Sequence, residues 1–334
     1  MRTYVAVSLL GLVAQTALAI EPLPKESGWN GYVSPVLSAM EFRDNQVAGA
    51  GPLDVGNKRI DSLDEKAEKQ SVGAFSCPAE VGYMFADQGI YLFLGNRLED
   101  FLRLDNGNAL GARVDLDRVG ILEASALFSA LPTEVWEDPF LTGADRQETD
   151  RTSAGAQIGL ANILGTKFEA TLTARSVEID DERSGESLGL SEADRDLLVR
   201  DGDGVRLELL YTWRVNDRNI LVPALDLGTY DAEGDAYSRD GAGMQLTHVY
   251  VQGRLRLVSN LALRQTNFEE KNPVFDKKQD EDEVVASVTA FYARFFEVPN
   301  LSGMASLLYT KRDSKITFYD AEASVASLGL LYTF

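Results

Sequence analysis

Apolar and polar residues alternate along most of the chain between residues 29 and 334. From 205 to 213 every odd position is apolar, while Arg206, Glu208 and Arg214 occupy even positions. In a β-strand this alternation places the charged side chains on one face, whereas a helix would scatter them around its circumference. The pattern recurs in several other segments, so the sequence predicts an all-β protein.

The connections between the alternating segments fall into two kinds. Short polar turns are predicted at residues 86–89, 116–119, 164–166, 215–219, 258–260 and 298–300. Long, charge-rich loops are predicted at residues 43–72, 99–108, 131–152, 179–203, 231–243, 269–283 and 313–320. Six turns and seven loops define fourteen strands with both chain ends on the turn side, centred near residues 35, 79, 93, 112, 125, 157, 171, 209, 224, 249, 263, 290, 307 and 328. Most segments have the roughly ten residues that a tilted strand needs to cross a bilayer.

A soluble β-sandwich and a closed transmembrane barrel would both show this alternation. In a sandwich, however, short turns and long loops would not sort to opposite ends. The apolar face also carries Tyr211, Trp213, Tyr332 and Phe334 near strand ends, a position that suits the membrane–water interface. A closed barrel pairs every backbone group without leaving an edge in lipid. We therefore predict a transmembrane, antiparallel, up-and-down β-barrel of about fourteen strands.

The N-terminus has the three parts of a secretory signal peptide. Arg2 is followed by an apolar run at 5–13 and by a small-residue cleavage pattern at 17–19. The predicted order is a signal peptide at 1–19, a short periplasmic N-terminal segment at 20–27 and the barrel at 28–334. The segment before the barrel is too short for a plug domain, so we expect no plug.

Acidic residues are concentrated in the predicted loops. The chain has 52 Asp and Glu against 32 Lys and Arg, a net charge of −20. The seven loops hold 37 acidic and 16 basic residues, which accounts for the whole charge of −21 expected after the signal peptide is removed. Such an acidic chain is not expected to bind nucleic acid. A single Cys and a single His exclude an internal disulfide, a Cys-rich zinc site and any metal site or relay that needs two His.

The loop at 179–203 is the most acidic, with nine acidic and three basic residues. Within it, Ser191-Glu192-Ala193-Asp194 is a capping-box pattern that leads into Leu197-Leu198-Val199. We predict a short helix here that packs over or into the barrel mouth.

Alternation also assigns a set of side chains to the lumen. The predicted lining comprises Arg113, Asp115, Glu123, Lys167, Glu169, Arg175, Arg206, Glu208, Arg214, Asp226, His248, Arg254, Arg256, Arg264 and Arg294. Arginine suits such a wall because it stays charged at any pH and makes bidentate contacts. The arginines on strands ten to twelve would face acids on strands four, five and nine, and the resulting transverse field would orient polar solutes. The alternative is a lattice of ion pairs that only rigidifies the barrel.

Catalytic motifs have little support. Gly185-Glu186-Ser187-Leu188-Gly189 matches G-x-S-x-G, but it lies in an acidic loop rather than between a strand and a helix. Asp201-Gly202-Asp203-Gly204 lacks the spaced ligands and final Glu of a calcium loop. The sole histidine, His248, is predicted to be a polar lumen residue. A lipid hydrolase based on it is the least favoured hypothesis, because no nucleophile beside it can be named.

The C-terminal stretch Leu328-Gly329-Leu330-Leu331-Tyr332-Thr333-Phe334 resembles the terminal signature of bacterial outer-membrane barrels, including porins. This resemblance implies Sec export and recognition by the barrel-assembly machinery through Leu328, Leu330, Tyr332 and Phe334. It also implies an outer-membrane location, with both termini in the periplasm and the acidic loops outside. The opening Gly28-Trp29-Asn30-Gly31-Tyr32 resembles an uncharacterised outer-membrane family catalogued as a domain of unknown function.

Two functions are compatible with these observations. The first is an outer-membrane channel, monomeric rather than trimeric, that passes small polar or charged solutes through an Arg-rich lumen with charges of both signs. The second is a non-conducting surface barrel whose acidic loops bind Ca²⁺ or Mg²⁺, lipopolysaccharide or an external partner. We predict no cofactor and no catalytic residue in the barrel, and we do not expect an enzyme.

Overall fold

The computed structural model describes residue 20 and residues 22–50, 53–96 and 107–334. The predicted signal peptide at 1–19 and most of the predicted loop at 99–108 lie outside the described residues. The strands are β1 (Gly28–Val33), β2 (Val36–Arg43), β3 (Val47–Ala50), β4 (Leu53–Asp54), β5 (Gln70–Ser76), β6 (Ala79–Phe85), β7 (Ile90–Asn96), β8 (Gly107–Asp115), β9 (Ile121–Ser129), β10 (Thr133–Trp136), β11 (Glu148–Ala161), β12 (Phe168–Ile179), β13 (Gly202–Tyr211), β14 (Trp213–Arg214), β15 (Asn219–Ala232), β16 (Arg239–Gln252), β17 (Leu255–Phe268), β18 (Glu281–Ala293), β19 (Leu301–Ser314) and β20 (Ala321–Thr333). The remaining elements are the short helix α3 (Glu192–Asp196) and the 3₁₀ turns η1 (Ile163–Gly165), η2 (Glu186–Leu188), η3 (Phe295–Glu297) and η4 (Thr317–Tyr319).

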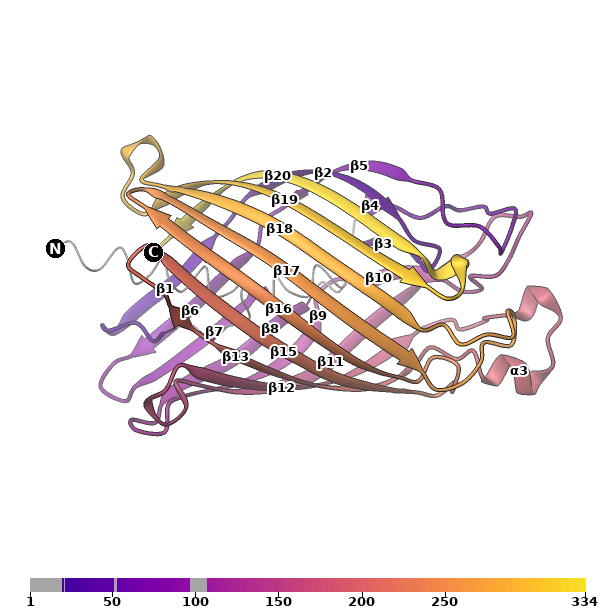
Figure 1. The fold of residues 1–334 in the computed structure, drawn as a ribbon, viewed down its shortest axis with the longest axis horizontal. Helices are drawn as coiled ribbons and strands as arrows, with labels where there is room; N and C mark the ends of the chain where they lie inside the picture. Colours follow the sequence, from indigo (N-terminus) through magenta and orange to yellow (C-terminus); the bar gives the residue numbers. More distant parts are fainter. Residues whose placement is uncertain (1–19, 21, 51–52, 97–106) are drawn as a thin grey trace.

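The sheet closes into an antiparallel barrel of fourteen strands, as predicted (Figure 1). β1 and β2 together form the first barrel strand, and β5 and β6 form the second. The other twelve are β7, β8, β9, β11, β12, β13, β15, β16, β17, β18, β19 and β20. β20 pairs with both β2 and β1, which closes the barrel. At this seam Gly31 and Phe334 exchange two backbone hydrogen bonds of 3.1 and 3.0 Å.

The first two barrel strands are each interrupted at a proline. Pro35 separates β1 from β2, and Pro78 separates β5 from β6. Proline has no backbone N–H to donate, so the ladder breaks at these positions. Ser34 bridges the gap, because its N–H donates to Pro78 O at 2.8 Å and its hydroxyl donates to Leu330 O at 2.9 Å.

Short turns and long loops lie at opposite ends of the barrel (Figure 1). We call them the turn end, which also carries the C-terminus, and the loop end, which carries α3. Five of the six predicted turns overlap observed turns, but the turn predicted at 258–260 is wrong. β16 and β17 are joined at Gly253 and Arg254, and residues 258–260 lie inside β17. Gly253 has a φ of +60°, which glycine adopts without strain.

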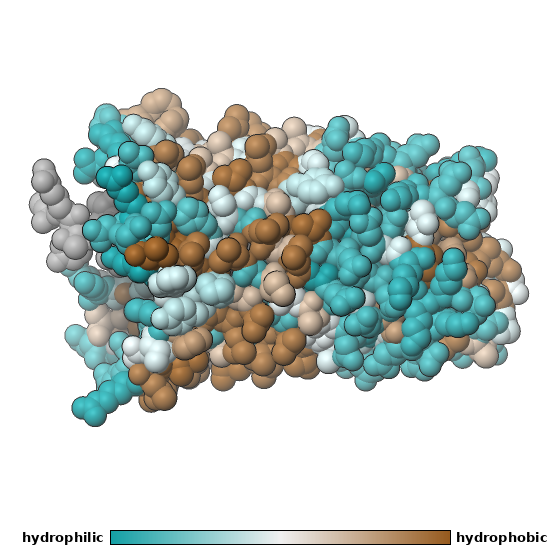
Figure 2. Space-filling model, in the orientation of Figure 1, coloured by the Kyte–Doolittle hydropathy of each residue, from teal (hydrophilic) through white to brown (hydrophobic). Residues whose placement is uncertain are grey.

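The outer face of the barrel carries a broad apolar band (Figure 2). Its most exposed leucines include Leu37, Leu225, Leu261, Leu307 and Leu328. At the turn end the exposed aromatic residues include the predicted Tyr211, Trp213, Tyr332 and Phe334. Among the described residues, no helix is long and apolar enough to span a membrane.

The inner face carries apolar side chains as well as polar ones. One inward cluster near the turn end comprises Tyr32, Val249, Val258, Phe291 and Leu331. A second comprises Met84, Tyr91, Phe93, Ala109 and Leu127. Apolar residues therefore occupy both faces at this end, and hydrophobicity alone does not identify the face that a side chain is on.

Residues 22–27 lie inside the turn end rather than below it. Leu23 packs against the inward cluster that contains Met84, Tyr91 and Phe93. Ser27 Oγ accepts a hydrogen bond of 2.9 Å from the N–H of Ala86, in the turn between β6 and β7. The segment at 20–27 was expected in the periplasm, and its apolar contact explains why it folds back onto the inner wall.

Replacing Gly82 by alanine should destabilise the barrel. A Cβ on Gly82 would lie 2.3 Å from Tyr91 Cζ and 2.5 Å from the carbonyl oxygen of Leu92, so the ring of Tyr91 must move. Overpacking of this kind costs about 1–3 kcal/mol. The control is Gly73→Ala, because the closest atom to a Cβ on Gly73 is 4.0 Å away. The urea midpoint of unfolding in lipid vesicles measures both variants, and equal midpoints would contradict the close packing at Gly82.

Candidate functional site

A cluster of paired charges lies on the inner wall formed by β6, β8 and β9. Arg113 is 4% exposed, and its Nε lies 2.7 Å from Glu123 Oε2 while its Nη2 lies 3.6 Å from Glu80 Oε2. Its guanidinium carbon lies 4.4 Å from the centroid of the Phe93 ring. The Tyr91 hydroxyl donates to Glu80 Oε1 at 3.3 Å. Ion pairs and aromatic contacts thus hold this arginine in one place against the wall.

A second cluster of charges joins β13, β15 and β17. Arg206 pairs with both Glu208 and Asp226, and Arg264 pairs with Asp226. Arg264 reaches Asp226 by crossing β16 at a glycine, because a Cβ on Gly241 would lie 2.5 Å from Arg264 Nη2. The four side chains form a chain in which positive and negative charges alternate.

Nine of the fifteen predicted lining residues lie on the inner face of the strands. They are Arg113, Glu123, Glu169, Arg175, Arg206, Glu208, Asp226, Arg256 and Arg264. With Glu80, which the prediction omitted, this set has five acidic and five basic residues. The predicted separation into basic and acidic walls is wrong, because Arg264 pairs directly with Asp226. Local charge balance, rather than a field across the lumen, characterises this set.

Five other predicted lining residues lie at or beyond the strand ends. Asp115, Lys167 and Arg214 are exposed at the turn end. Arg254 and Arg294 lie in turns, so their assignment to the lumen is wrong. The Arg254 guanidinium donates to both carboxylate oxygens of Glu297, at 2.7 and 3.0 Å. This side-chain pairing raises the pKa of Arg254, and it joins two neighbouring turns rather than lining the lumen.

His248 lies on the outer face of β16, so its assignment to the lumen is also wrong. Leu246, on the same face, is 47% exposed, whereas Val249 faces inward and is buried. Val249 packs in the inward apolar cluster. The alternation pattern treated such apolar residues as lipid-facing, and it therefore assigned His248 to the inner face. His248 Nε2 lies 2.9 Å from Asn219 Oδ1. Ser187 of the G-x-S-x-G match lies in a loop at the other end of the barrel.

On the strands from β16 round to β2 the inner wall carries uncharged polar side chains between charged ones such as Arg256 and Arg264. Hydrogen bonds join them between strands, from Thr247 to Asn260 at 2.5 Å, from Asn260 to Ser287 at 3.1 Å, between Thr289 and Ser306 at 2.9 Å, and between Ser38 and Ser327 at 2.8 Å. The lumen therefore carries hydrogen-bonded hydroxyl and amide groups alongside its charged residues.

Six long loops pack together over the loop end. We call this assembly the cap, and it comprises the described residues of 44–69, 130–147, 180–201, 233–238, 269–280 and 315–320. Its core of buried side chains comprises Phe140, Leu198, Ala236, Tyr237, Ile316, Phe318 and Tyr319, together with Ala232 and Phe268 at strand ends. The ring centroids of Phe140 and Phe318 are 5.5 Å apart. These two residues come from loops on opposite sides of the barrel, so their contact lies over the mouth.

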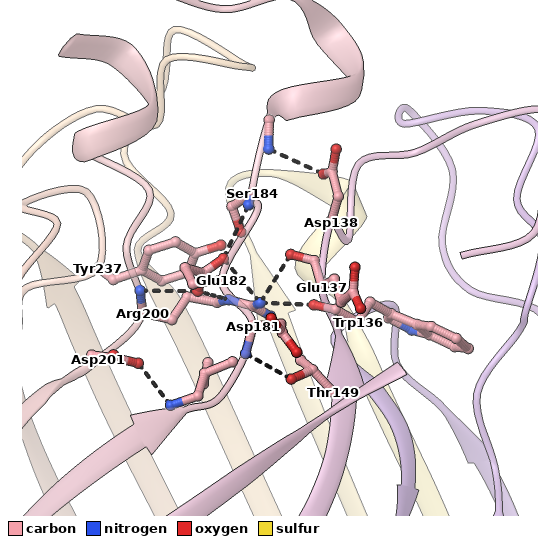
Figure 3. Close-up of polar contacts among 12 residues, drawn as sticks. Trp136, Glu137, Asp138, Thr149, Asp181, Glu182, Ser184, Arg200, Asp201 and Tyr237 are labelled. Atoms are coloured by element: carbon pink, nitrogen blue, oxygen red, sulfur yellow. Dashed lines mark hydrogen bonds and ion pairs between the residues drawn. The ribbon is translucent and has the colours of Figure 1, made fainter. Parts of the chain in front are cut away.

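A polar network ties the loop at 180–201 to the loop at 130–147 (Figure 3). Arg200 donates to the carboxylate of Glu182 at 2.6 Å and to the carbonyl oxygen of Trp136 at 2.7 Å. The Asp138 carboxylate accepts backbone hydrogen bonds of 3.0 and 2.8 Å from residues 185 and 187. These bonds satisfy backbone groups that the irregular loops leave unpaired.

The short helix predicted in the loop at 179–203 is confirmed as α3. Its N-cap is Ser191, whose hydroxyl accepts a hydrogen bond of 3.2 Å from the N–H of Asp194. Directly after the helix, Leu198 is fully buried in the cap core. The short helix therefore directs an apolar side chain over the barrel mouth, as predicted.

Arg146 joins two loops from inside the cap. It is fully buried and donates to the carbonyl oxygens of Asn45 at 2.9 Å, of Pro139 at 3.1 Å and of Asn57. Its guanidinium carbon lies 4.2 Å from the centroid of the Trp136 ring. Burial lowers the pKa of Arg146 to about 10, so the side chain remains charged at neutral pH.

Tyrosine hydroxyls join three further loops in the cap. The hydroxyl oxygens of Tyr237 and Tyr319 lie 3.0 Å apart, and Asn272 Nδ2 donates to Tyr319 Oη at 2.7 Å. Burial raises the pKa of Tyr237 to about 12, so its phenol stays protonated at neutral pH. The cap is thus connected by polar contacts as well as by its apolar core.

The acidic residues of the cap do not form a metal site. Within the ranges that the structure describes, no group of three or more His, Cys, Asp or Glu side chains is arranged to hold a metal ion. Some loop acids pair with lysine instead, as Asp280 does with Lys315 at 2.6 Å and Asp276 with Lys271 at 2.9 Å. The geometry therefore adds no support to the cation-binding hypothesis.

The core of the cap was not predicted, because the many charged residues of the loops indicated solvated segments. The available signal was the set of aromatic residues within them, Trp136, Phe140, Tyr237, Phe275, Phe318 and Tyr319. Soluble surfaces rarely expose so many large apolar side chains together, so such loops are expected to pack on one another.

Replacing Arg146 by methionine should loosen the cap and leave the barrel intact. The change removes the donors for three buried carbonyl groups, and an unpaired buried group costs about 1–3 kcal/mol. We expect proteolysis of the loops in the folded protein to become at least tenfold faster, while heat-modifiable migration on gels stays unchanged. Arg183→Gln is the control, since Arg183 is also in the cap but its side chain is 56% exposed. Equal proteolysis rates in the two variants would contradict the role of Arg146.

Three solved structures are similar to this chain at low sequence identity. The outer membrane channel DcaP of Acinetobacter baumannii is 10% identical, with a TM-score of 0.48 and coverage of 92% of this chain and 97% of that chain. OmpT of Vibrio cholerae, folded in vitro, is 10% identical, with a TM-score of 0.43 and coverage of 91% and 98%. An anion-selective porin from Comamonas acidovorans is 9% identical, with a TM-score of 0.41 and coverage of 92% and 100%. No curated protein matches the chain.

A family match covers the whole barrel. Residues 28–333, from β1 to β20, match the family described as "Protein of unknown function (DUF2860)". The match confirms the resemblance of the opening at 28–32 to a family of unknown function. The chain therefore belongs to the DUF2860 family.

Proposed function

We propose that the protein is an outer-membrane channel for small polar solutes, with its turn end in the periplasm and its loop end outside the cell. The observation that carries the proposal is the inner wall, where paired charges lie among hydrogen-bonded hydroxyl and amide groups. Such a wall solvates polar molecules, while the apolar outer band suits lipid. The channel acts as a monomer in this proposal.

The pairing of charges in the wall bears on which solutes pass. Arg113, Arg206 and Arg264 each contact a carboxylate, so little net charge is left to attract ions of one sign. We therefore expect neutral and zwitterionic polar solutes to pass as readily as anions or cations. This is weaker selectivity than a wall of unpaired arginines would give.

The cap limits access from the loop end. Contacts such as that between Phe140 and Phe318 lie over the mouth, so a solute must pass between cap segments or wait for them to move. Loop motions of this kind occur on nanosecond to microsecond timescales or slower. We expect a channel of low conductance that opens further when the cap is loosened.

Single-channel recording in planar bilayers tests the proposal. The wild-type protein should give small conductance steps, and Arg146→Met should give larger or more frequent ones because its cap is loosened. Arg183→Gln should behave like the wild type. Silence of all three proteins, under conditions in which a control porin conducts, would overturn the channel proposal.

Reversal potentials in a salt gradient test the charge balance of the lumen. Replacing Arg206 and Arg264 together by glutamine leaves Glu208 and Asp226 without these partners, so the selectivity should shift towards cations by about twofold or more. The matched control is Arg254→Gln, which removes an arginine paired in a turn rather than in the lumen. An unchanged reversal potential in the double variant would show that these side chains do not line the solute path.

A non-conducting surface barrel is the second candidate, and the packed cap is the observation that favours it. A cap with its own buried core presents a stable acidic surface, which suits recognition of an external protein with a basic surface, or of lipopolysaccharide phosphates through bridging divalent cations. For either function we also propose that the barrel-assembly machinery recognises the C-terminal strand. Leu328, Tyr332 and Phe334 on that strand are exposed on the outer side.

A further inference from the structure

The residue that follows the predicted cleavage site lies against the inner wall of the barrel. The backbone nitrogen of Ile20 donates a hydrogen bond of 2.6 Å to Glu169 Oε1. Glu169 is 5% exposed and lies on β12, the seventh barrel strand. β1 is the first of fourteen strands, so Ile20 and the described residues 22–27 lie on different sides of the turn end.

Gly159 on β11 makes room for the side chain of Ile20. A Cβ on Gly159 would lie only 2.7 Å from Ile20 Cδ1, so a larger residue at position 159 must displace either the side chain of Ile20 or the strand. Leu23 packs against the apolar cluster that contains Tyr91 and Phe93, and Ser27 accepts the hydrogen bond from Ala86. The contacts of Ile20, Leu23 and Ser27 therefore place the described part of the N-terminal segment against the inner wall of the barrel.

We propose that the α-ammonium group created by signal-peptide cleavage pairs with Glu169 inside the lumen. In the cleavage, a signal peptidase hydrolyses the amide bond between Ala19 and Ile20. The hydroxyl of water joins the carbonyl carbon of Ala19, and the remaining hydrogen joins the nitrogen of Ile20, which becomes a primary amine. An α-amino group has an ordinary pKa near 8, so it takes up a proton at neutral pH.

Cleavage changes the nature of the contact at Glu169. Before cleavage the nitrogen of Ile20 is a neutral amide donor, whereas afterwards it is a cation beside a buried carboxylate. Cleavage therefore adds the attraction between two opposite charges to a hydrogen bond that the carboxylate already strengthens. Processing of the chain thus fixes the N-terminal segment across the turn end, where it narrows the lumen.

The test is the reactivity of the α-amine in the folded, processed protein. Mass spectrometry first identifies the N-terminal residue, which should be Ile20. 2-Pyridinecarboxaldehyde, which condenses with an α-amine and the next amide nitrogen, then labels the protein in detergent micelles at neutral pH. We expect the folded wild type to react at least tenfold more slowly than the urea-unfolded protein, and Glu169→Gln to remove most of this protection.

Two further variants make the result decisive. Glu208→Gln removes another inward carboxylate and should leave the protection unchanged. Gly159→Val displaces Ile20 without altering Glu169 and should also expose the amine. This variant therefore tests the proposal even if Glu169→Gln does not fold. Another N-terminal residue, equal labelling of folded and unfolded wild type, or full protection in both Glu169→Gln and Gly159→Val would overturn the proposal.

The labelling experiment does not depend on the proposed channel function. If the protein also conducts, Glu169→Gln should raise its conductance, because the segment is no longer fixed across the turn end. A silent protein with a protected amine would reject the channel and leave the N-terminal contact intact.

Discussion

The pairing of backbone hydrogen bonds determines the architecture of this protein. An unpaired N–H or C=O in hydrocarbon costs several kcal/mol, so a sheet in lipid must have no edge. The pairing of β20 with β1 and β2 removes the edge, and Ser34 supplies hydrogen bonds at the break beside Pro35 and Pro78. Once the wall is closed, its outer face is free to be apolar and its inner face can carry the polar groups.

Burial away from water also determines how charges are placed inside the barrel and the cap. A buried charge is tolerated when it is paired or well hydrogen-bonded. Arg113 lies between two carboxylates, Arg206 and Arg264 share Asp226, and Arg146 is surrounded by carbonyl oxygens. These contacts fix the wall and join the loops, so the large acidic excess at the loop end surrounds a packed core rather than a set of free loops.

The strand count and the two kinds of connection were predictable because they depend on local alternation and on turn residues. The face of individual side chains was less predictable. The turn at Gly253 lies inside what appeared to be one continuous strand, and inward Val249 and Val258 resemble lipid-facing residues, so His248 was assigned to the wrong face. Glu80 was missed because its strand is irregular after Pro78. The cap core depends on contacts between loops far apart in sequence, such as Phe140 with Phe318, and no local pattern encodes those.

The most direct test of the central claim is osmotic swelling of proteoliposomes that contain the purified barrel, with neutral polar solutes of increasing size. A lumen lined by balanced charges and hydroxyl groups under a cap should admit the smallest solutes, and the swelling rate should fall steeply as solute size increases. Loosening the cap should extend the range of solutes that enter. Swelling no faster than that of protein-free liposomes for every solute, with or without a loosened cap, would contradict the account.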